Sequence, residues 1–154
     1  MQLSQLLELD RIICNYQAAS KKRVLEQLSQ LIANGETDLS QSQVFDSLLS
    51  RERLGSTGLG RGVAIPHARI KNSDRTIAAL LKLESGVDYD AIDGQAVDLV
   101  FALLVPEQAT DEHLQLLAQL AEMFSNSELV IRLRNASEPQ QLLQAIQEWQ
   151  HDHP

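Results

Sequence analysis

The chain's most apolar stretch, VDLVFALLV at residues 97–105, decides the fold class. Apart from the aspartate at position 98 it contains no polar side chain, so it lacks the alternation of a half-exposed strand. A run of this kind is typical of a strand that other layers cover on both faces. Pro106 follows, and proline has no N–H to donate to a neighbouring strand. The sequence therefore predicts a central strand at residues 97–105.

Strand and helix patterns alternate on either side of this strand. Residues 76–83 and 63–65 predict further strands, and residues 11–16 predict a short one. Ser20 is a typical helix N-cap, and Ser40 with Gln43 forms a capping-box pattern that opens another helix. The expected helices are residues 3–9, 21–34, 41–53, 111–125 and 128–134, and a last one that starts near Ser137 with Pro139 in its first turn.

The helix expected at residues 111–125 follows the central strand. Thr110 is its expected N-cap, and two acidic residues in its first turn suit the helix dipole. We expect its buried face to consist of Leu114, Leu117, Ala118, Ala121 and Phe124.

Interleaved strands and helices indicate an α/β protein. We predict a single domain, residues 1–150, with a mixed β-sheet flanked by helices on both faces as a three-layer sandwich. The polar residues 151–154 are expected to form a disordered tail. A chain of 154 residues is long enough to bury one core.

Composition limits the possible functions. The net charge of −8 argues against nucleic-acid binding, which normally needs a basic face. The longest apolar run, residues 99–105, is too short to insert across a membrane. Cys14 is the single cysteine, and the start of the chain does not resemble a signal peptide, so we expect a reducing, cytoplasmic location. No metal-ligand spacing is present, and we expect neither a metal nor a cofactor.

One short segment has the opposite charge to the rest of the chain. Residues 51–75 contain six basic and two acidic side chains, a net charge of +4. His67 lies within it, directly after Pro66, which restricts the backbone at the end of the strand expected at residues 63–65. Imidazole titrates near neutral pH and acts as a nucleophile or proton shuttle, and arginine suits phosphate and carboxylate groups. The pattern therefore indicates a site for a small anion.

The same segment carries a resemblance to a known family. The stretch RERLGSTGLG at residues 51–60, running into VAIPH at residues 63–67, resembles the signature of the mannitol/fructose-type enzyme IIA proteins of the bacterial phosphotransferase system. The GSTG version, with DGQ at residues 93–95 and VDL at residues 97–99, is most similar to the nitrogen-regulatory members. The resemblance extends from about residue 3 to residue 149.

The resemblance implies roles for individual residues. His67 would be the phosphoacceptor, carrying the phosphoryl group on Nε2 as tele-phosphohistidine. The donor would be an HPr-like phosphocarrier protein, charged by an enzyme I homologue. His113 matches a second active-site histidine and Arg51 an arginine that holds the phosphoryl group. Ala68 stands where glycine is common, and Arg69 where lysine is frequent.

Phosphoryl transfer depends mainly on positioning and charge neutralisation. We expect backbone N–H groups of the glycine-rich loop at residues 55–62 to bind phosphoryl oxygens, with phosphate contacts from Ser56, Thr57 and Gly58. A role in the turn alone is the alternative for these three. Three basic residues, Arg61, Arg69 and Lys71, are expected to form a docking rim for a partner, or else a solvated face. Without the resemblance, His113 would be a capping or surface residue, and Arg51 would solvate a helix C-terminus.

The predicted function is a phosphotransferase that carries phosphate on a histidine in the nitrogen-related phosphotransferase system. Its phosphorylation state would regulate protein partners, which in this family include potassium-handling proteins and sensor kinases. One alternative is a sugar-transport enzyme IIA of the fructose/mannitol type that passes phosphate to a IIB cysteine. Another is a non-catalytic anion-binding or interaction module, against which the presence of both His67 and His113 argues.

Overall fold

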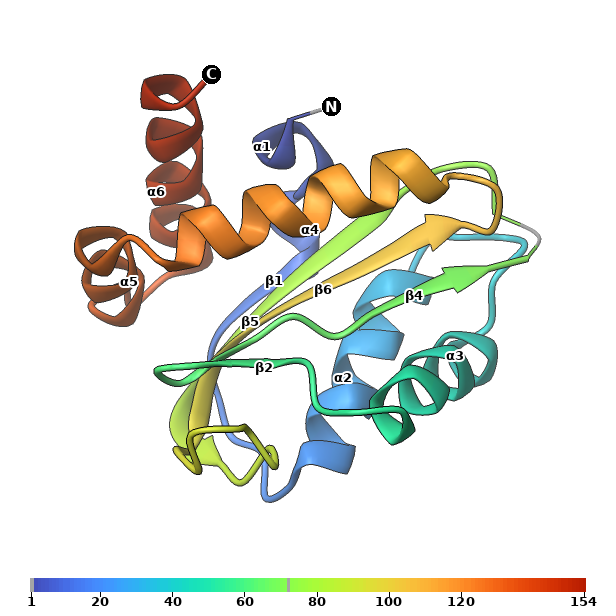
Figure 1. Cartoon of the computed structure of the whole chain (residues 1–154), viewed down its shortest axis with the longest axis horizontal. Helices are drawn as coiled ribbons and strands as arrows, with labels where there is room; N and C mark the ends of the chain where they lie inside the picture. Colours follow the sequence, from blue (N-terminus) through green and yellow to red (C-terminus); the bar gives the residue numbers. More distant parts are fainter. Residues whose placement is uncertain (1, 72) are drawn as a thin grey trace.

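A computed structural model describes residues 2–71 and 73–154. In these residues, six strands form one mixed sheet with helices on both faces, which confirms the predicted α/β class (Figure 1). The elements in chain order are α1 (Leu3–Leu6), the 3-10 helix η1 (Leu9–Arg11), β1 (Ile12–Tyr16), α2 (Lys21–Ala33), α3 (Gln41–Arg53), β2 (Gly58–Gly60), β3 (Val63–Ala64), β4 (His67–Ile70), β5 (Ile77–Val87), β6 (Val97–Pro106), α4 (Thr110–Phe124), α5 (Ser127–Arg134) and α6 (Pro139–Asp152).

Strand β6 is the centre of the sheet. It pairs with β5 in antiparallel fashion, with Phe101 opposite Leu80, and with β3 and β4 in parallel fashion on its other side. Strand β1 runs parallel to β5 at one edge, and β2 runs antiparallel to β3 at the other. The predicted central strand is confirmed, since residues 99–105 are all buried.

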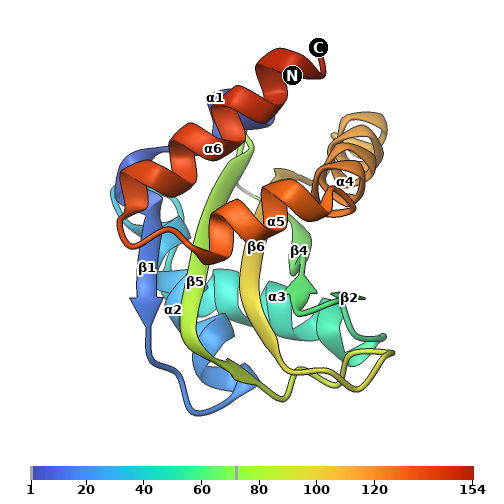
Figure 2. The ribbon, with the colours of Figure 1, turned by 90° about the vertical axis from the view of Figure 1, so that its left-hand side faces the viewer.

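The two faces of the sheet bury two separate cores. Helices α1, α4, α5 and α6 cover one face, while α2 and α3 cover the other (Figure 2). Along β6, Phe101 and Leu103 pack into the first core, and Val100, Ala102 and Leu104 pack into the second. Successive side chains of a strand point to opposite faces, so this apolar run supplies both cores at once.

Helix α4 differs from the expectation in two ways. Thr110 is its first residue and not its N-cap, which is Ala109 without a side-chain cap. Its buried residues are His113, Leu116, Leu120, Met123 and Phe124, and Leu117 is partly buried against the core, so the predicted face was wrong at Leu114, Ala118 and Ala121. Leucines occupy several sides of this helix, so the periodicity alone does not decide which side faces the sheet. Leu114, expected to be buried, is 62% exposed.

Helix α6 runs through Asp152, two residues beyond the boundary expected at residue 150. The ring of His153 stacks on Trp149 with centroids 4.5 Å apart, and its Nδ1 lies 2.8 Å from the Trp149 carbonyl oxygen. Residues 151 and 152 thus continue the last helix, and His153 packs on it.

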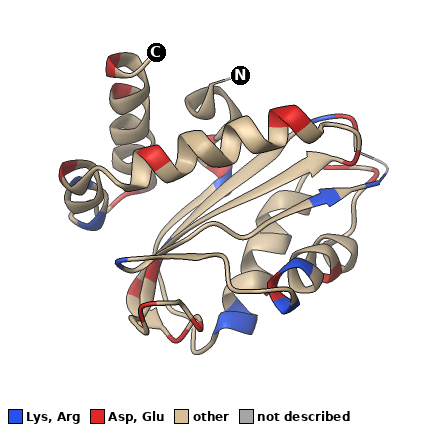
Figure 3. Cartoon of the chain, viewed as in Figure 1, with Lys and Arg blue, Asp and Glu red and all other residues tan. Residues whose placement is uncertain are grey.

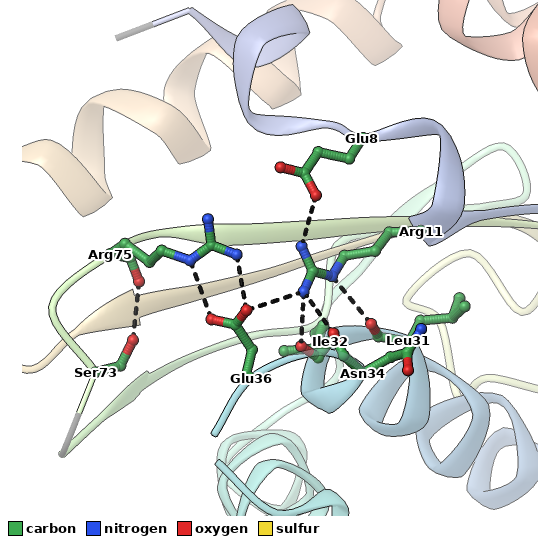
Figure 4. Close-up of polar contacts among 8 residues, drawn as sticks. All are labelled: Glu8, Arg11, Leu31, Ile32, Asn34, Glu36, Ser73 and Arg75. Carbon is green, nitrogen blue, oxygen red and sulfur yellow. Dashed lines mark hydrogen bonds and ion pairs between the residues drawn. The ribbon is translucent and has the colours of Figure 1, made fainter. Parts of the chain in front are cut away.

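The side chain of a buried arginine, Arg11, caps the C-terminal end of α2 (Figure 4). Arg11 donates to the carbonyl oxygens of Leu31 and Asn34, at 3.0 and 2.9 Å, which the helix leaves without internal partners. Glu36 bridges Arg11 and Arg75, at 3.3 and 2.8 Å. This cluster joins the start of the chain, the α2–α3 connection and the residues before β5. None of the helices in residues 2–71 and 73–154 combines the length and apolar character needed to cross a bilayer.

Candidate active site

A proline lies between two short strands, β3 and β4, directly before His67. Strands β3 and β4 both run parallel to β6, with Ala64 opposite Val100 and His67 opposite Leu103. Between them, Pro66 has no N–H to contribute to the ladder. Its carbonyl oxygen still accepts from the Leu103 N–H of β6 at 3.0 Å, and on the other side of the strand Ile65 donates its N–H to the carbonyl oxygen of Thr57, at 3.0 Å. His67 therefore begins a strand of its own, β4, which the sequence did not predict.

The ring of His67 is held by the residue two positions before it. Nδ1 of His67 lies 2.8 Å from the carbonyl oxygen of Ile65. A carbonyl only accepts hydrogen bonds, so Nδ1 carries the hydrogen and Nε2 of the neutral ring keeps its electron pair. Burial has the largest effect on His67 and lowers its pKa, and the charge of Arg51 lowers it further. The hydrogen bond to Ile65 and the charge of Glu52 act in the opposite direction. The net lowering keeps the imidazole neutral at physiological pH.

His113 lies beside His67 although 46 positions separate them in the sequence. It is in the first turn of α4, and the two ring centroids are 5.2 Å apart with an interplanar angle of 78°. Burial, and then the neighbouring His67, Arg69 and Arg51, lower the pKa of His113 to about 4. Its Nδ1 is buried and has no hydrogen-bond partner among residues 2–71 and 73–154. Two neutral imidazoles thus meet edge to face at one place.

Both histidines line a cleft of about 750 Å³ between α3, β4 and α4. Arg51, in the last turn of α3, donates to the carbonyl oxygen of Gly55 at 2.9 Å, and Arg69 of β4 donates to Oγ1 of Thr110 at 3.4 Å. Basic residues lie on β4 and at the end of α3, opposite the acidic first turn of α4 (Figure 3). The full lining is Asp46, Ser47, Ser50, Arg51, Leu54, His67, Ala68, Arg69, Glu107, Thr110, His113, Leu114 and Leu117.

The structure thus brings together His67, His113, Arg51 and Arg69, but it places other predicted residues elsewhere. Ser56, Thr57 and Gly58 do not line the cleft. Ser56 donates to the Tyr89 carbonyl oxygen at 3.2 Å, Thr57 is buried against Glu52, and Gly58 is in β2. Their predicted phosphate contact is therefore not supported. The hydroxyl groups of Ser56 and Thr57 bond within the protein, and Gly58 donates its N–H to the Ser56 hydroxyl at 3.1 Å, in line with the alternative interpretation of these three as turn residues.

The three residues of the predicted docking rim do not lie together in the structure. Arg61 precedes β3, at the end of that strand remote from His67, where its N–H donates to Asp93 at 2.8 Å. Lys71 is exposed just after β4 and is not part of the cleft lining, whereas Arg69 is. Only Arg69 of the three is therefore placed beside the histidines.

Sequence reasoning missed one whole wall of the cleft. Ser47, Ser50, Arg51 and Leu54 are spaced as i, i+3, i+4 and i+7 at the end of α3, so they share one helix face. Because Arg51 was already a predicted site residue, the helical spacing from it would have identified Ser47, Ser50 and Leu54 as its neighbours on the same helix face. Leu54, at 84% exposed, is a large apolar residue at the cleft margin.

Comparisons with known proteins assign the chain to a family. Residues 5–149 match the family described as "Phosphoenolpyruvate-dependent sugar phosphotransferase system, EIIA 2". Proteins named nitrogen regulatory protein from Pseudomonas aeruginosa and Escherichia coli are 45% and 40% identical to this chain, with 95% of the chain and 95% and 90% of those proteins covered. The crystal structure of nitrogen regulatory protein IIA-Ntr from Neisseria meningitidis superposes with a TM-score of 0.88 at 39% identity, covering 94% of this chain and 98% of that one.

The chain therefore belongs to the EIIA 2 family of the phosphoenolpyruvate-dependent phosphotransferase system, a family of phosphotransferases. Within that system it has the role of a phosphocarrier of the nitrogen-related branch, as its similarity to the nitrogen regulatory proteins indicates. The resemblance inferred from residues 51–67 is thereby confirmed.

Proposed function

We propose that His67 is the phosphoacceptor and that Nε2 is the nitrogen that carries the phosphoryl group. The observation that carries this proposal is the hydrogen bond from Nδ1 to the Ile65 carbonyl oxygen, which leaves Nε2 as the nitrogen with a free electron pair. The lowered pKa of His67 supports it, because a protonated ring has no electron pair with which to attack phosphorus.

The donor is a phosphohistidine on an HPr-like protein. The N–P bond of the donor breaks, its electron pair returns to the donor ring, and His67 Nε2 forms the new N–P bond. No proton needs to move, because Nδ1 of His67 keeps its hydrogen throughout. The ring becomes cationic as the bond forms, and the Ile65 carbonyl oxygen then accepts a stronger, charge-assisted bond. Arg51 and Arg69 supply positive charge for the phosphoryl oxygens.

His113 has a supporting role in this transfer. Its low pKa keeps it neutral, so it does not repel the cationic ring that forms at His67. A neutral imidazole still has one N–H, which can donate a hydrogen bond to a phosphoryl oxygen. His113 would therefore accelerate the transfer without being required for His67 to be modified.

The carrier is proposed to dock on the apolar margin of the cleft. Leu54 and Leu114 are 84% and 62% exposed, and both line the cleft beside the histidines. Exposed apolar side chains around a polar site are typical of protein interaction surfaces. Leu54→Asp and Leu114→Asp should weaken binding of the HPr-like protein in a titration. Ile131→Asp, at a 59% exposed position on α5 outside the cleft, is the matched control and should bind normally.

We further propose that the protein acts in the cytoplasm and that its two phosphorylation states bind regulated partners differently. Potassium-handling proteins and sensor kinases are the partner classes. The phosphoryl group carries about two negative charges and the ring one positive charge, so the cleft lined by Arg51 and Arg69 becomes more negative by about one charge, which changes the charge that a partner meets. Pull-down with unphosphorylated and phosphorylated protein would test this, and equal retention of every partner by both states would contradict it.

Phosphorylation itself is tested with phosphoenolpyruvate, enzyme I and an HPr-like carrier. The protein should gain the mass of one phosphoryl group, labile in acid and stable in base. His67→Ala should abolish the gain, whereas His151→Ala, at an exposed position, should leave it unchanged. A non-catalytic module would gain no mass. A sugar-transport enzyme IIA would pass the group to a IIB cysteine, which a matched IIB domain would reveal.

A further inference from the structure

A buried carboxylate lies next to Arg51 in the sequence but faces away from the cleft. Glu52 is 7% exposed, and Nζ of Lys21 lies 2.8 Å from its Oε2. Its two oxygens also accept from the Thr57 N–H at 3.2 Å, from the Thr57 hydroxyl, and from the Tyr89 hydroxyl at 3.1 Å. Four donor groups, contributed by three residues from helix α2 and two loops, thus converge on one side chain.

These bonds continue to the phosphoacceptor through the backbone. Glu52 holds Thr57 by both its N–H and its hydroxyl. The carbonyl oxygen of Thr57 accepts from the Ile65 N–H at 3.0 Å, and the carbonyl oxygen of Ile65 bonds Nδ1 of His67 at 2.8 Å. Each residue in this sequence of contacts fixes the position of the next.

We propose that Glu52 is the positioning residue for His67, because it fixes Thr57 and Ile65 so that the ring is held with Nδ1 protonated and Nε2 available. The inference deepens the function proposed above. Glu52 does not touch the phosphoryl group or the cleft and acts only through Thr57 and Ile65.

The chemistry requires a carboxylate at this position. Two ionised oxygens accept about four hydrogen bonds and donate none, which matches the four donors present. Burial, followed by the negative charge of Glu52, raises the pKa of Tyr89, so its hydroxyl remains a donor. A glutamine would keep one acceptor oxygen but turn an NH₂ group toward other donors. Glu52→Gln therefore preserves the shape of the side chain while it disrupts the contacts of Thr57.

The chain contains a matched control in the cluster of Figure 4. Glu36 also joins distant segments, since it accepts from Arg75 at 2.8 and 3.0 Å and from Arg11 at 3.3 Å. Its partners do not belong to the Thr57–Ile65–His67 contacts. Glu36→Gln therefore makes the same chemical change at another bridging carboxylate. It measures how far the loss of such a bridge, without a change to the Thr57 contacts, affects the His67 tautomer and the rate of phosphorylation.

The decisive measurement is the ¹⁵N chemical shifts of the His67 ring nitrogens in the unphosphorylated protein, which identify the protonated nitrogen. Wild type and Glu36→Gln should show the Nδ1–H form. Glu52→Gln should show a substantial fraction of the Nε2–H form, and its initial rate of phosphorylation should fall by about tenfold or more. The proposal is overturned if Glu52→Gln retains the Nδ1–H form, or if Glu36→Gln loses it to the same extent.

Thr57 provides a second pair of variants in case Glu52→Gln does not fold. Thr57→Val removes the hydroxyl bond to Glu52 at similar volume, and Thr57→Ser restores it. Thr57→Val should shift the His67 tautomer and slow phosphorylation, and Thr57→Ser should behave as wild type. Equal behaviour of the two variants would overturn the proposal. The tautomer is measured on the unphosphorylated protein, so it does not depend on phosphoryl transfer. If wild type gained no phosphoryl group, the phosphoacceptor role of His67 would be refuted, but the effect of Glu52 on the His67 tautomer would still stand.

Discussion

Replacing His113 with phenylalanine should remove a pH-dependent loss of stability. In the folded protein the pKa of His113 is lowered from 6.5 to about 4, because burial and the neighbouring His67 disfavour its charged form. In the unfolded chain the imidazole returns to a pKa of about 6.5. Between these two pH values only the unfolded state binds the proton, so the native state loses stability as the pH falls.

The size of the effect follows from the two pKa values. A pKa lowered from 6.5 to about 4 corresponds to about 3.4 kcal/mol in total. At pH 5.0 the unfolded histidine is almost fully protonated and the folded one almost fully neutral, so about 2 kcal/mol of this is already lost. The loss is absent above about pH 7.5 and complete below about pH 3. Against a total stability of about 5 to 15 kcal/mol, it is readily measured.

The assay is urea unfolding at pH 7.5 and at pH 5.0. Wild type should lose about 2 kcal/mol more between the two pH values than His113→Phe, which keeps a ring of similar size but cannot titrate. The side chain of His151 is 89% exposed, so His151→Phe should leave the pH dependence of wild type unchanged. If wild type and His113→Phe lose the same free energy, His113 is not held neutral by its surroundings, and the electrostatic argument for the paired imidazoles fails.

Two further substitutions test the geometry of the site and of the edge strand. Arg51→Lys should reduce the initial rate of phosphoryl acceptance by about tenfold, because an ammonium group cannot reproduce the two-pronged hydrogen bonding of a guanidinium. Arg53→Lys, at an exposed position, is the control and should leave this rate unchanged. Equal rates in the two variants would remove Arg51 from the mechanism. Gly62→Ala should lower the thermal unfolding midpoint, at a cost of about 1 to 3 kcal/mol, because its φ is +81° and a Cβ there would collide with the Arg134 guanidinium. Gly35→Ala has a similar φ of +79° and open space around it, so it measures the backbone strain alone, and an equal loss in both variants would show that the collision contributes nothing.

The link between Pro66 and His67 explains why a short motif carries so much of the function. The proline removes one N–H from the ladder with β6, although its carbonyl oxygen still accepts from the Leu103 N–H at 3.0 Å, and the Ile65 carbonyl oxygen lies against the ring of the histidine two residues later. The same two peptide groups thus shape the edge of the sheet and choose the tautomer of His67. A site built on a strand in this way is held more rigidly than one on a loop.

The sequence by itself determined the layered fold and indicated the residue that is proposed as the phosphoacceptor. The uninterrupted apolar run of β6 requires cover on both faces, and the capping residues Ser20 and Ser40 mark the helices that follow them. These signals are local, because strand burial and helix capping depend on neighbouring residues. His67 was identifiable for the same reason, from the proline before it and the basic residues around it.

Only the tertiary structure decided which residues meet His67. Helix α4 has apolar residues on several sides, so its rotation is set by packing against the sheet, and that rotation buries His113 and exposes Leu114. The glycine-rich loop turns away from the cleft because Glu52 and Tyr89 bind Thr57 more favourably than solvent would. Both outcomes depend on contacts between residues distant in the chain, and no local pattern contains that information.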